Sequence, residues 1–559
     1  MDSTNPAPPS ARLAPVWPTR IGVVLLLFAL VVWFANLDAR RLIKSDEGRY
    51  AEIAREMAVG GDWITPRLND IKYFYKPPLQ YWATAAFYKA FGVDEWTARL
   101  WNALTGLATV LFTAYFAARL FGRERGIAAG IVLGSSALPV GLAHVLTLDM
   151  GLACFMTVTL GGFLLAQRDG ATARETRGWM MVAWAGMALG VLSKGLPAVV
   201  LPGAVLVLYS LWQRDFALWR RLHLGKGLLL FFAIAAPWFV AVSLANPEFP
   251  RYFFWHEHVE RFLTRVHGRY EPWWYFVPVL AGGLLPWTLL APRALVLGAR
   301  RESGASFQPA RVLWLWTVVI FVFFSASSSK LASYILPLFP ALAVLLALAI
   351  AQACTRTLRG SLAPVAVGAL ALAAATPWSA RLASREIPAE LYAAFAPWIV
   401  ASMLLLAAGL LGALWLDARG RRGAALVTAG LAGLVPTQGM VTGHDALAPA
   451  QSAAGIASAI RPYARPDVPF YSVNFYDHTL DFYLERTVTL VESKNEFEFG
   501  IAQEPHRFVP TFEEFARRWT ADRQALAITS REYFPRVQSS GLPLVVVAED
   551  TRRVVFRKP

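Results

Sequence analysis

The sequence predicts an all-α polytopic membrane bundle of about 13 transmembrane helices, followed by a C-terminal α/β extracytoplasmic domain. The chain has 559 residues, of which 56% are hydrophobic and 16% are charged, and its mean hydropathy is +0.43. A soluble fold cannot bury so much apolar surface. The apolar segments recur between short connectors, and they end near residue 441, where short segments typical of strands begin.

The candidate spans are apolar segments expected to form helices, because a helix satisfies its own backbone hydrogen bonds in lipid. They cover residues 21–37, 100–120, 126–145, 151–166, 179–192, 196–212, 228–244, 274–290, 312–324, 331–350, 362–377, 398–415 and 424–441. We therefore expect a transmembrane domain over residues 21–441, with one long polar loop at 38–99.

The second domain is expected over residues 442–559. Short apolar segments predict strands at 468–475, 488–491, 525–529, 544–548 and 553–557, and amphipathic patterns predict helices at 478–485 and 511–519. It carries no glycine-rich loop or metal motif, so we expect it to act as a cap over a cavity in the membrane domain.

Arginine-rich connectors predict the orientation. They lie at residues 123–125, 168–177, 214–226, 293–311, 356–359 and 419–422, and such loops stay in the cytoplasm. Residues 1–20 then form a cytoplasmic tail before an uncleaved signal anchor. The same arginines explain the net charge of +15, so we expect no nucleic-acid partner. Cys154 and Cys354 lie in or beside apolar segments, which excludes a disulfide framework.

Candidate functional residues gather on the opposite, outward face. Asp46 and Glu47 open a short amphipathic helix after Ser45, an expected N-cap, and this helix is expected to lie on the membrane. The two carboxylates could carry chemistry, or they could simply complement the helix dipole. Arg49 lies one turn further on, where it could pair with Asp46 or hold a phosphate.

Five further segments of this face carry candidates. Tyr73 and Lys76 precede a rigid Pro-Pro pair, which suits an ammonium that binds an anion, although interfacial lysines also snorkel among aromatic rings. Asp149 lies in a short turn between two apolar segments. A carboxylate near lipid is unfavourable in free energy, so Asp149 is expected either to have a function or to be a solvated turn residue.

The segment 255–262 holds His256 and His258, which are weak metal candidates, and Arg261, which could contact a phosphate. Ser327 to Lys330 open an apolar span near Tyr334, an arrangement suited to phosphate oxygens or to interfacial anchoring. Lys194 is a weaker candidate of the same kind.

These motifs resemble those of the GT-C integral-membrane glycosyltransferases, most closely the lipid A aminoarabinose transferases and more distantly the protein O-mannosyltransferases. The resemblance covers residues 21–441 and rests on the motifs beginning at Asp46, Gly61, Lys76, Asp149 and Glu257, and on the segment from Ser329 to Pro337. The C-terminal domain resembles theirs in position and size alone.

The resemblance implies transfer of a sugar, expected to be 4-amino-4-deoxy-L-arabinose, from undecaprenyl phosphate to lipid A or another envelope acceptor in a bacterial inner membrane. Catalysis would fall to Asp46, Asp149 and Glu47. Substrate binding would fall to Arg49, Tyr73, Lys76, His258, Arg261, Lys330 and Tyr334. A divalent metal is conceivable, no other cofactor is indicated, and the protein is expected to act as a monomer.

One residue departs from the resembled family, which generally reads Phe-Glu-Lys-Pro where this chain reads Phe74-Tyr75-Lys76-Pro77. The lost carboxylate leaves the identity of the sugar open. A transferase acting on a protein hydroxyl or another glycan is the main alternative. A secondary transporter would show inverted repeats and ionisable residues near mid-span, and a non-catalytic envelope scaffold would not need Asp46 and Asp149.

Overall fold

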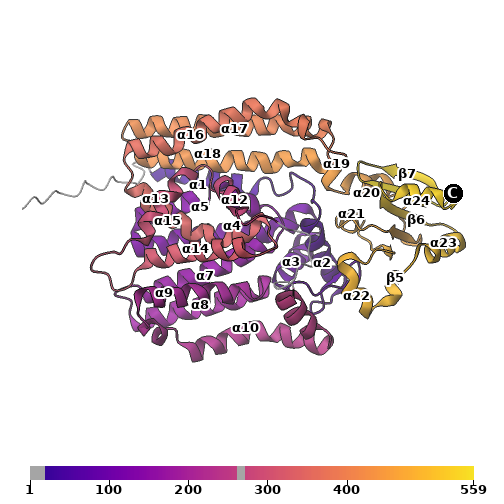
Figure 1. The fold of residues 1–559 in the computed structure, drawn as a ribbon, viewed down its shortest axis with the longest axis horizontal. Helices are drawn as coiled ribbons and strands as arrows, with labels where there is room; N and C mark the ends of the chain where they lie inside the picture. The colour runs from indigo at the N-terminus through magenta and orange to yellow at the C-terminus, as the bar shows by residue number, and fades with distance from the viewer. Residues whose placement is uncertain (1–18, 261–270) are drawn as a thin grey trace, which may run out of the picture.

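The computed structural model describes residues 19–260 and 271–559, and it shows a helical bundle with a smaller α/β domain at one end (Figure 1). The predicted tail at residues 1–20 lies almost entirely outside the described residues. The bundle is built from α1 (Thr19–Phe34), α4 (Glu95–Phe121), α5 (Arg123–Leu133), α6 (Ala137–Ala143), α7 (Asp149–Gln167), α8 (Ala173–Lys194), α9 (Pro197–Gln213), α10 (Leu224–Ala245), α12 (Phe276–Gly283), α13 (Ala291–Ala299), α14 (Pro309–Ala326), α15 (Phe339–Ala351), α16 (Thr355–Ala375), α17 (Ala389–Ala418) and α18 (Arg422–Gly443).

Each of the predicted spans overlaps a helix or a helix pair of the bundle, which confirms the fold class. Among the described residues, eight helices are long and apolar enough to cross a membrane, or up to ten if each bent pair is one span. The α5–α6 pair bends by 66°, at Gly134 and two serines, and α12 is bent by 112° from the segment 288–299. Short helices complete the bundle: η1 (Ala217–Arg221), η2 (Arg251–Glu260), η3 (Thr288–Leu290), η4 (Ala332–Leu338) and η5 (Thr376–Leu382).

Two of the arginine-rich connectors meet at the end of the bundle that lies away from the α/β domain (Figure 1). The backbone N–H of Ser306 donates to Asp169 at 3.0 Å, and the N–H of Gln308 donates to the Tyr209 hydroxyl at 2.9 Å. The positively charged end and the long loop with its candidate residues are therefore at opposite ends of the bundle (Figure 1).

The C-terminal domain contains a six-stranded mixed sheet in the order β5-β4-β3-β6-β8-β7. Its strands are β3 (Phe470–Val473), β4 (Thr489–Val491), β5 (Phe508–Val509), β6 (Leu526–Ser530), β7 (Val545–Glu549) and β8 (Arg553–Arg557). Its helices are η6 (His444–Leu447), α19 (Ala448–Gln451), α20 (Ala454–Ile460), α21 (Leu480–Leu484), η7 (Asn495–Phe497), α22 (Glu498–Gln503), η8 (Pro505–Arg507), α23 (Phe512–Ala521) and α24 (Phe534–Ser539). The five predicted strands are confirmed. The two-residue strand β5 was missed because so short a segment has no readable alternation.

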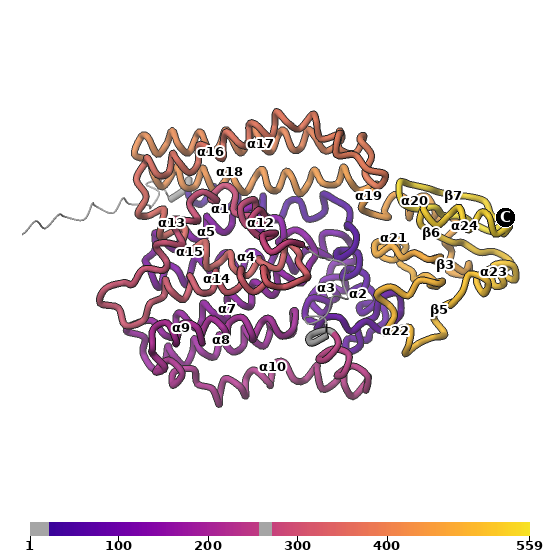
Figure 2. Tube along the Cα trace, in the orientation of Figure 1, coloured from indigo at the N-terminus to yellow at the C-terminus, as the bar shows by residue number. Residues whose placement is uncertain are grey.

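The long loop 38–99 folds into α2 (Asp46–Gly60), α3 (Leu79–Phe91) and the small hairpin β1 (Arg67–Leu68) and β2 (Ile71–Lys72). It lies between the bundle and the C-terminal domain (Figure 2). Helix α2 is buried over most of its length and contacts α3 and α21. Our expectation of a helix lying on the membrane is therefore wrong for α2, because the C-terminal domain covers it. The Ser45 side chain also makes no capping hydrogen bond.

Helix α2 approaches the backbone of the C-terminal domain closely at Gly48. A Cβ added there would lie 2.6 Å from Thr479 Cγ2 and would also overlap the backbone carbonyl of His478. We expect Gly48→Ala to push the domain away and to impair the protein's function severely, because backbone atoms cannot move aside as a flexible side chain can.

The matched control is Gly60→Ala in the last turn of the same helix, where nothing lies within 4 Å of the added Cβ. It should leave thermal stability unchanged or slightly raised, since alanine favours helix over glycine. Protease protection of the C-terminal domain and the protein's activity measure both variants. If the two variants had equal protease protection and equal activity, the close contact at Gly48 would be contradicted.

Candidate active site

One cavity of about 1460 Å³ lies where the bundle, the long loop and the C-terminal domain meet. The candidate residues that line it include Asp46, Arg49, Tyr73, Lys76, Asp149, Lys194, His256 and Tyr334. Its lining also includes residues 495, 496, 498, 499, 502 and 503 of the C-terminal domain. The domain therefore covers the cavity, as expected, and in addition builds part of its wall.

Asp46 is tied to the C-terminal domain through Arg49. The guanidinium of Arg49 donates to Asp46 Oδ1 at 2.8 Å and lies 2.7 Å from Glu496 Oε2. Glu496 also pairs with His478 and accepts a hydrogen bond from the Tyr73 hydroxyl at 3.0 Å. Burial opposes ionisation of Glu496, but His478 and Arg49 lower its pKa to about 2, so the carboxylate is charged. The sequence analysis missed Glu496 and His478, because no motif marks them.

Asp149 forms the second charged pair of the cavity. It is the first residue of α7, its side chain is buried, and it pairs with Lys194 at the end of α8. The Lys194 ammonium also lies 4.6 Å from the ring centroid of Tyr334. From the sequence we treat Lys194 as a weak candidate. A lysine at the end of an apolar span is costly in free energy, however, and this alone could have marked Lys194 as a functional residue.

Aromatic side chains hold the C-terminal segment 495–503 against the long loop. Tyr73 stacks on Tyr75 with ring centroids 4.6 Å apart, and the Tyr75 hydroxyl donates to the carbonyl oxygen of Glu496 at 3.0 Å. Tyr252 of η2 stacks on Phe499 at 3.9 Å. This packing fixes the wall of the cavity that faces the bundle.

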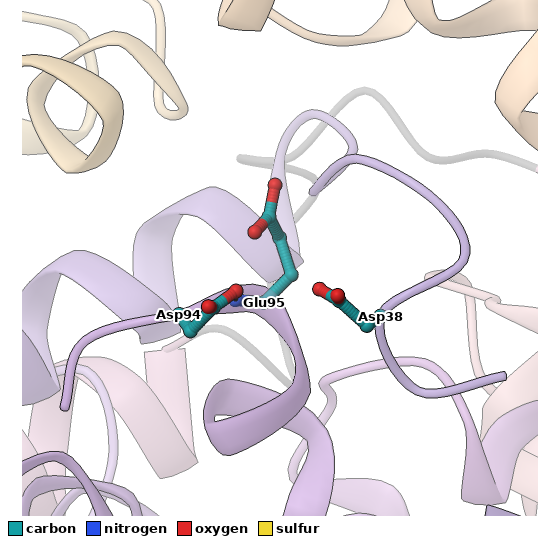
Figure 3. Close-up of side chains that lie close together, drawn as sticks. All are labelled: Asp38, Asp94 and Glu95. Atoms are coloured by element: carbon teal, nitrogen blue, oxygen red, sulfur yellow. Dashed lines mark hydrogen bonds between the residues drawn. The ribbon is translucent and has the colours of Figure 1, made fainter. Parts of the chain in front are cut away.

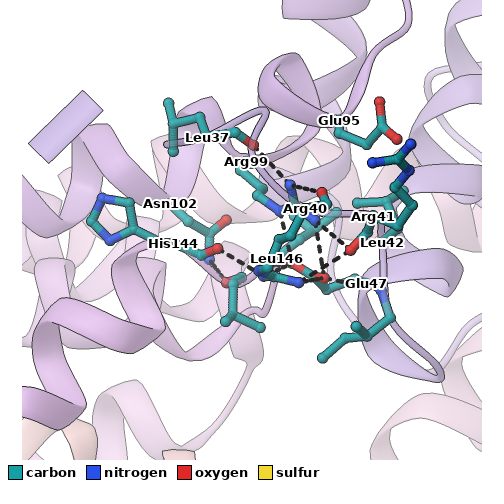
Figure 4. A network of polar contacts seen from close by, with 12 residues as sticks. Leu37, Arg40, Arg41, Leu42, Glu47, Glu95, Arg99, Asn102, His144 and Leu146 are labelled. Atoms are coloured by element: carbon teal, nitrogen blue, oxygen red, sulfur yellow. Dashed lines mark hydrogen bonds and ion pairs between the residues drawn. The ribbon is translucent and has the colours of Figure 1, made fainter. Parts of the chain in front are cut away.

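Glu47 does not line the cavity, which corrects our expectation of a catalytic role. Figure 4 shows Glu47 in a network of polar contacts with Arg40 and Arg99. Its carboxylate accepts two hydrogen bonds from Arg40, at 2.6 and 2.8 Å, and one from Arg99 Nε at 3.1 Å. It also accepts from the backbone N–H of Leu146 at 2.9 Å. Burial would raise the pKa of Glu47, but the two arginines hold it well below its usual range. Glu47 thus joins α2 to α4 and to the end of α6.

Lys330 does not line the cavity, and its ammonium is taken up by backbone carbonyls, which corrects the expectation that it binds a phosphate. Its side chain is buried, and the ammonium donates to the carbonyl oxygens of Glu271, at 2.9 Å, and Ser327. A buried ammonium needs such acceptors. Lys330 therefore fastens two loops, while Ser327, Ser329 and Tyr334 beside it line the cavity.

The metal candidates receive no support among the described residues. Within that part of the chain, the one group of three potential ligands is Asp38, Asp94 and Glu95, which lies outside the cavity lining (Figure 3). His256 lines the cavity and stacks on Tyr252. Arg261 and the side chain of His258 lie outside the described residues. No step below runs through a metal.

Comparisons with protein families define the class of the protein. The family model of the dolichyl-phosphate-mannose-protein mannosyltransferases matches residues 23–253, and that of the aminoarabinose transferase C-terminal domain matches residues 456–558. With the bundle and its charged cavity, these matches define the class of the protein as a GT-C glycosyltransferase, and its apolar helices make it a multi-pass protein of the bacterial inner membrane.

The particular family follows from solved structures. ArnT from Cupriavidus metallidurans bound to undecaprenyl phosphate is 38% identical, with a TM-score of 0.92 over 97% of this chain and 98% of that chain. The chain belongs to the ArnT family of aminoarabinose transferases.

Two curated relatives are similar over a shorter length. The undecaprenyl phosphate-alpha-4-amino-4-deoxy-L-arabinose arabinosyl transferase of Erwinia tasmaniensis is 33% identical over 332 residues, which are 59% of each chain. That of Shewanella sediminis is 34% identical over 342 residues, 61% of each chain. The chain thus spans about three-fifths of the length of these two relatives.

Proposed function

We propose that this protein transfers 4-amino-4-deoxy-L-arabinose from undecaprenyl phosphate to a phosphate of lipid A. The observation that carries the proposal is the cavity, where Asp46 pairs with Arg49 and Asp149 pairs with Lys194 at the edge of the apolar bundle. A lipid-linked donor and a lipid acceptor could both enter such a site from the membrane. The identity of the proposed sugar is taken from the names of the similar proteins.

In the proposed reaction an oxygen of the acceptor phosphate attacks the anomeric carbon of the sugar. The bond from that carbon to the donor phosphate breaks, and undecaprenyl phosphate leaves with the electron pair. Arg49, Lys76 and Lys194 supply positive charge for the two phosphates. Asp46 and Asp149 stabilise the positive charge that develops at the anomeric carbon. An anionic acceptor needs no strong base, so positioning and charge carry the catalysis.

The orientation is part of the same proposal. The arginine-rich connectors are at the end of the bundle away from the C-terminal domain (Figure 1), so the N-terminus faces the cytoplasm and the cavity faces the periplasm. The proposed domain boundaries at residues 20 and 441 lie within a few residues of the start of α1 and the end of α18. The described residues of one chain line the cavity, which supports a monomer.

Mass spectrometry of lipid A tests the function. Cells that lack their own aminoarabinose transferase but make the donor would express this chain. We expect a mass addition of one pentosamine per modified phosphate. A hexosamine-sized addition would keep the enzyme class but change the sugar. No addition, with folded protein present, would exclude lipid A and direct the search to protein hydroxyls or other envelope glycans.

A further inference from the structure

Five carboxylates line the cavity, and four of them already pair with a cation. The pairs are Asp46 with Arg49, Asp149 with Lys194, Glu248 with Lys72, and Glu496 with Arg49 and His478. The fifth is Glu498, for which the described part of the chain provides no hydrogen-bond or ion-pair partner. The cavity therefore contains one carboxylate, that of Glu498, with which no cation of the described residues pairs directly.

The backbone that carries Glu498 is firmly held although its carboxylate is exposed. Phe499, the next residue, stacks on Tyr252 and contacts the Phe74 ring with centroids 6.0 Å apart. A Cβ added at Gly500 would overlap the backbone carbonyl of Lys72, so α22 lies directly against β2. The backbone of Glu498 thus has a fixed place in the cavity wall, while its exposed carboxylate stays hydrated and can turn toward a ligand.

We propose that Glu498 binds the protonated amino group of the donor sugar, an inference that rests on the proposed function. An ammonium that enters the cavity needs a carboxylate, and each of the other four would have to share or lose a cation to supply one. Glu498 accepts the N–H groups of the sugar without breaking an existing pair. It is then a specificity-determining residue, and it takes no part in bond making or breaking.

The residue at position 75 of the cavity lining is a tyrosine, and this makes a carboxylate elsewhere in the cavity important for binding the amino group. Tyr75 brings no charge into the cavity, and its hydroxyl is used to donate to the carbonyl of Glu496. A negative charge for the amine must therefore come from another wall. Glu498, two residues beyond that carbonyl, supplies it from the C-terminal domain.

Glu498→Gln tests the inference, because it removes the charge and keeps the size of the side chain. The matched control is Glu513→Gln, another exposed carboxylate in the first turn of a C-terminal helix, outside the cavity. Purified full-length protein in liposomes would be given undecaprenyl-phosphate donors that carry either the 4-amino sugar or the 4-hydroxy sugar. We expect Glu498→Gln to lower kcat/KM for the amino donor roughly 10-fold and to leave the hydroxy donor unchanged.

Glu513→Gln should behave as wild type with both donors. An equal loss on both donors would overturn the inference, because it would show that Glu498 only positions the wall. An unchanged preference for the amino donor would overturn it as well, while the proposed function would stand. If the wild-type protein itself does not use the amino donor, both the proposed function and this inference fail. Thermal unfolding of each variant confirms that the proteins compared are folded.

Discussion

Replacing Asp46 by Asn should lower the rate of sugar transfer roughly 10²- to 10³-fold, the usual cost of removing one electrostatic stabiliser of a transition state. Asp46 lies in the cavity, and its side chain keeps 29% of its accessible surface. Asparagine has the same size and can still accept the hydrogen bond from Arg49. We therefore expect kcat to fall while the unfolding temperature stays close to that of the wild type.

The control for this variant is Asp38→Asn, which removes a carboxylate of the same long loop that does not line the cavity. Asp38 lies instead beside Asp94 and Glu95 (Figure 3). Turnover of a radiolabelled donor in liposomes measures both. The control should transfer sugar at the wild-type rate. If Asp46→Asn also stays within a few-fold of wild type, the reacting carbon is not beside Asp46. Asp149 would then become the first carboxylate to test.

Replacing Glu47 by Gln should destabilise the protein by about 3–5 kcal/mol, because it leaves two buried guanidinium groups without their counter-charge. Arg40 and Arg99 are both almost fully buried, and Glu47 is the carboxylate that each of them contacts (Figure 4). Native proteins have total stabilities of only about 5–15 kcal/mol, so a loss of this size is severe. We expect little folded protein and a much lower unfolding temperature in detergent.

Glu95→Gln is the matched control, since Glu95 is a half-buried carboxylate in the first turn of α4. It accepts a hydrogen bond from the Tyr483 hydroxyl at 3.1 Å and pairs with no arginine among the described residues. Its replacement should change stability little. A Glu47→Gln protein that is stable but inactive would contradict the structural role and restore the catalytic one.

Much of the architecture could be read from the sequence, because lipid imposes strict rules on the chain. A span such as residues 398–415 must be apolar and helical, and α17 contains it. Asp46 and Asp149 could also be found in advance, since ionisable groups beside apolar spans are costly and therefore conspicuous. The strands of the C-terminal domain were recognised where alternation was long enough to read.

The partners of those residues were decided by tertiary structure. The sequence treats Asp46 and Glu47 alike, but adjacent residues of a helix point about 100° apart. Asp46 consequently faces the cavity, whereas Glu47 reaches Arg40 and Arg99. The sequence predicts that Lys330 binds a phosphate. In the structure its ammonium donates instead to the carbonyl oxygen of Glu271, 59 residues away in the chain.

The sequence by itself determined the membrane bundle, the position of the long loop and two of the cavity carboxylates, because these depend on local composition. Glu496 and Glu498 line the cavity because the C-terminal domain packs on α2 and β2. These two elements lie more than 400 residues earlier in the chain. A contact of that separation leaves no local pattern, since it is specified by the fit of two distant surfaces at Gly48 and Gly500.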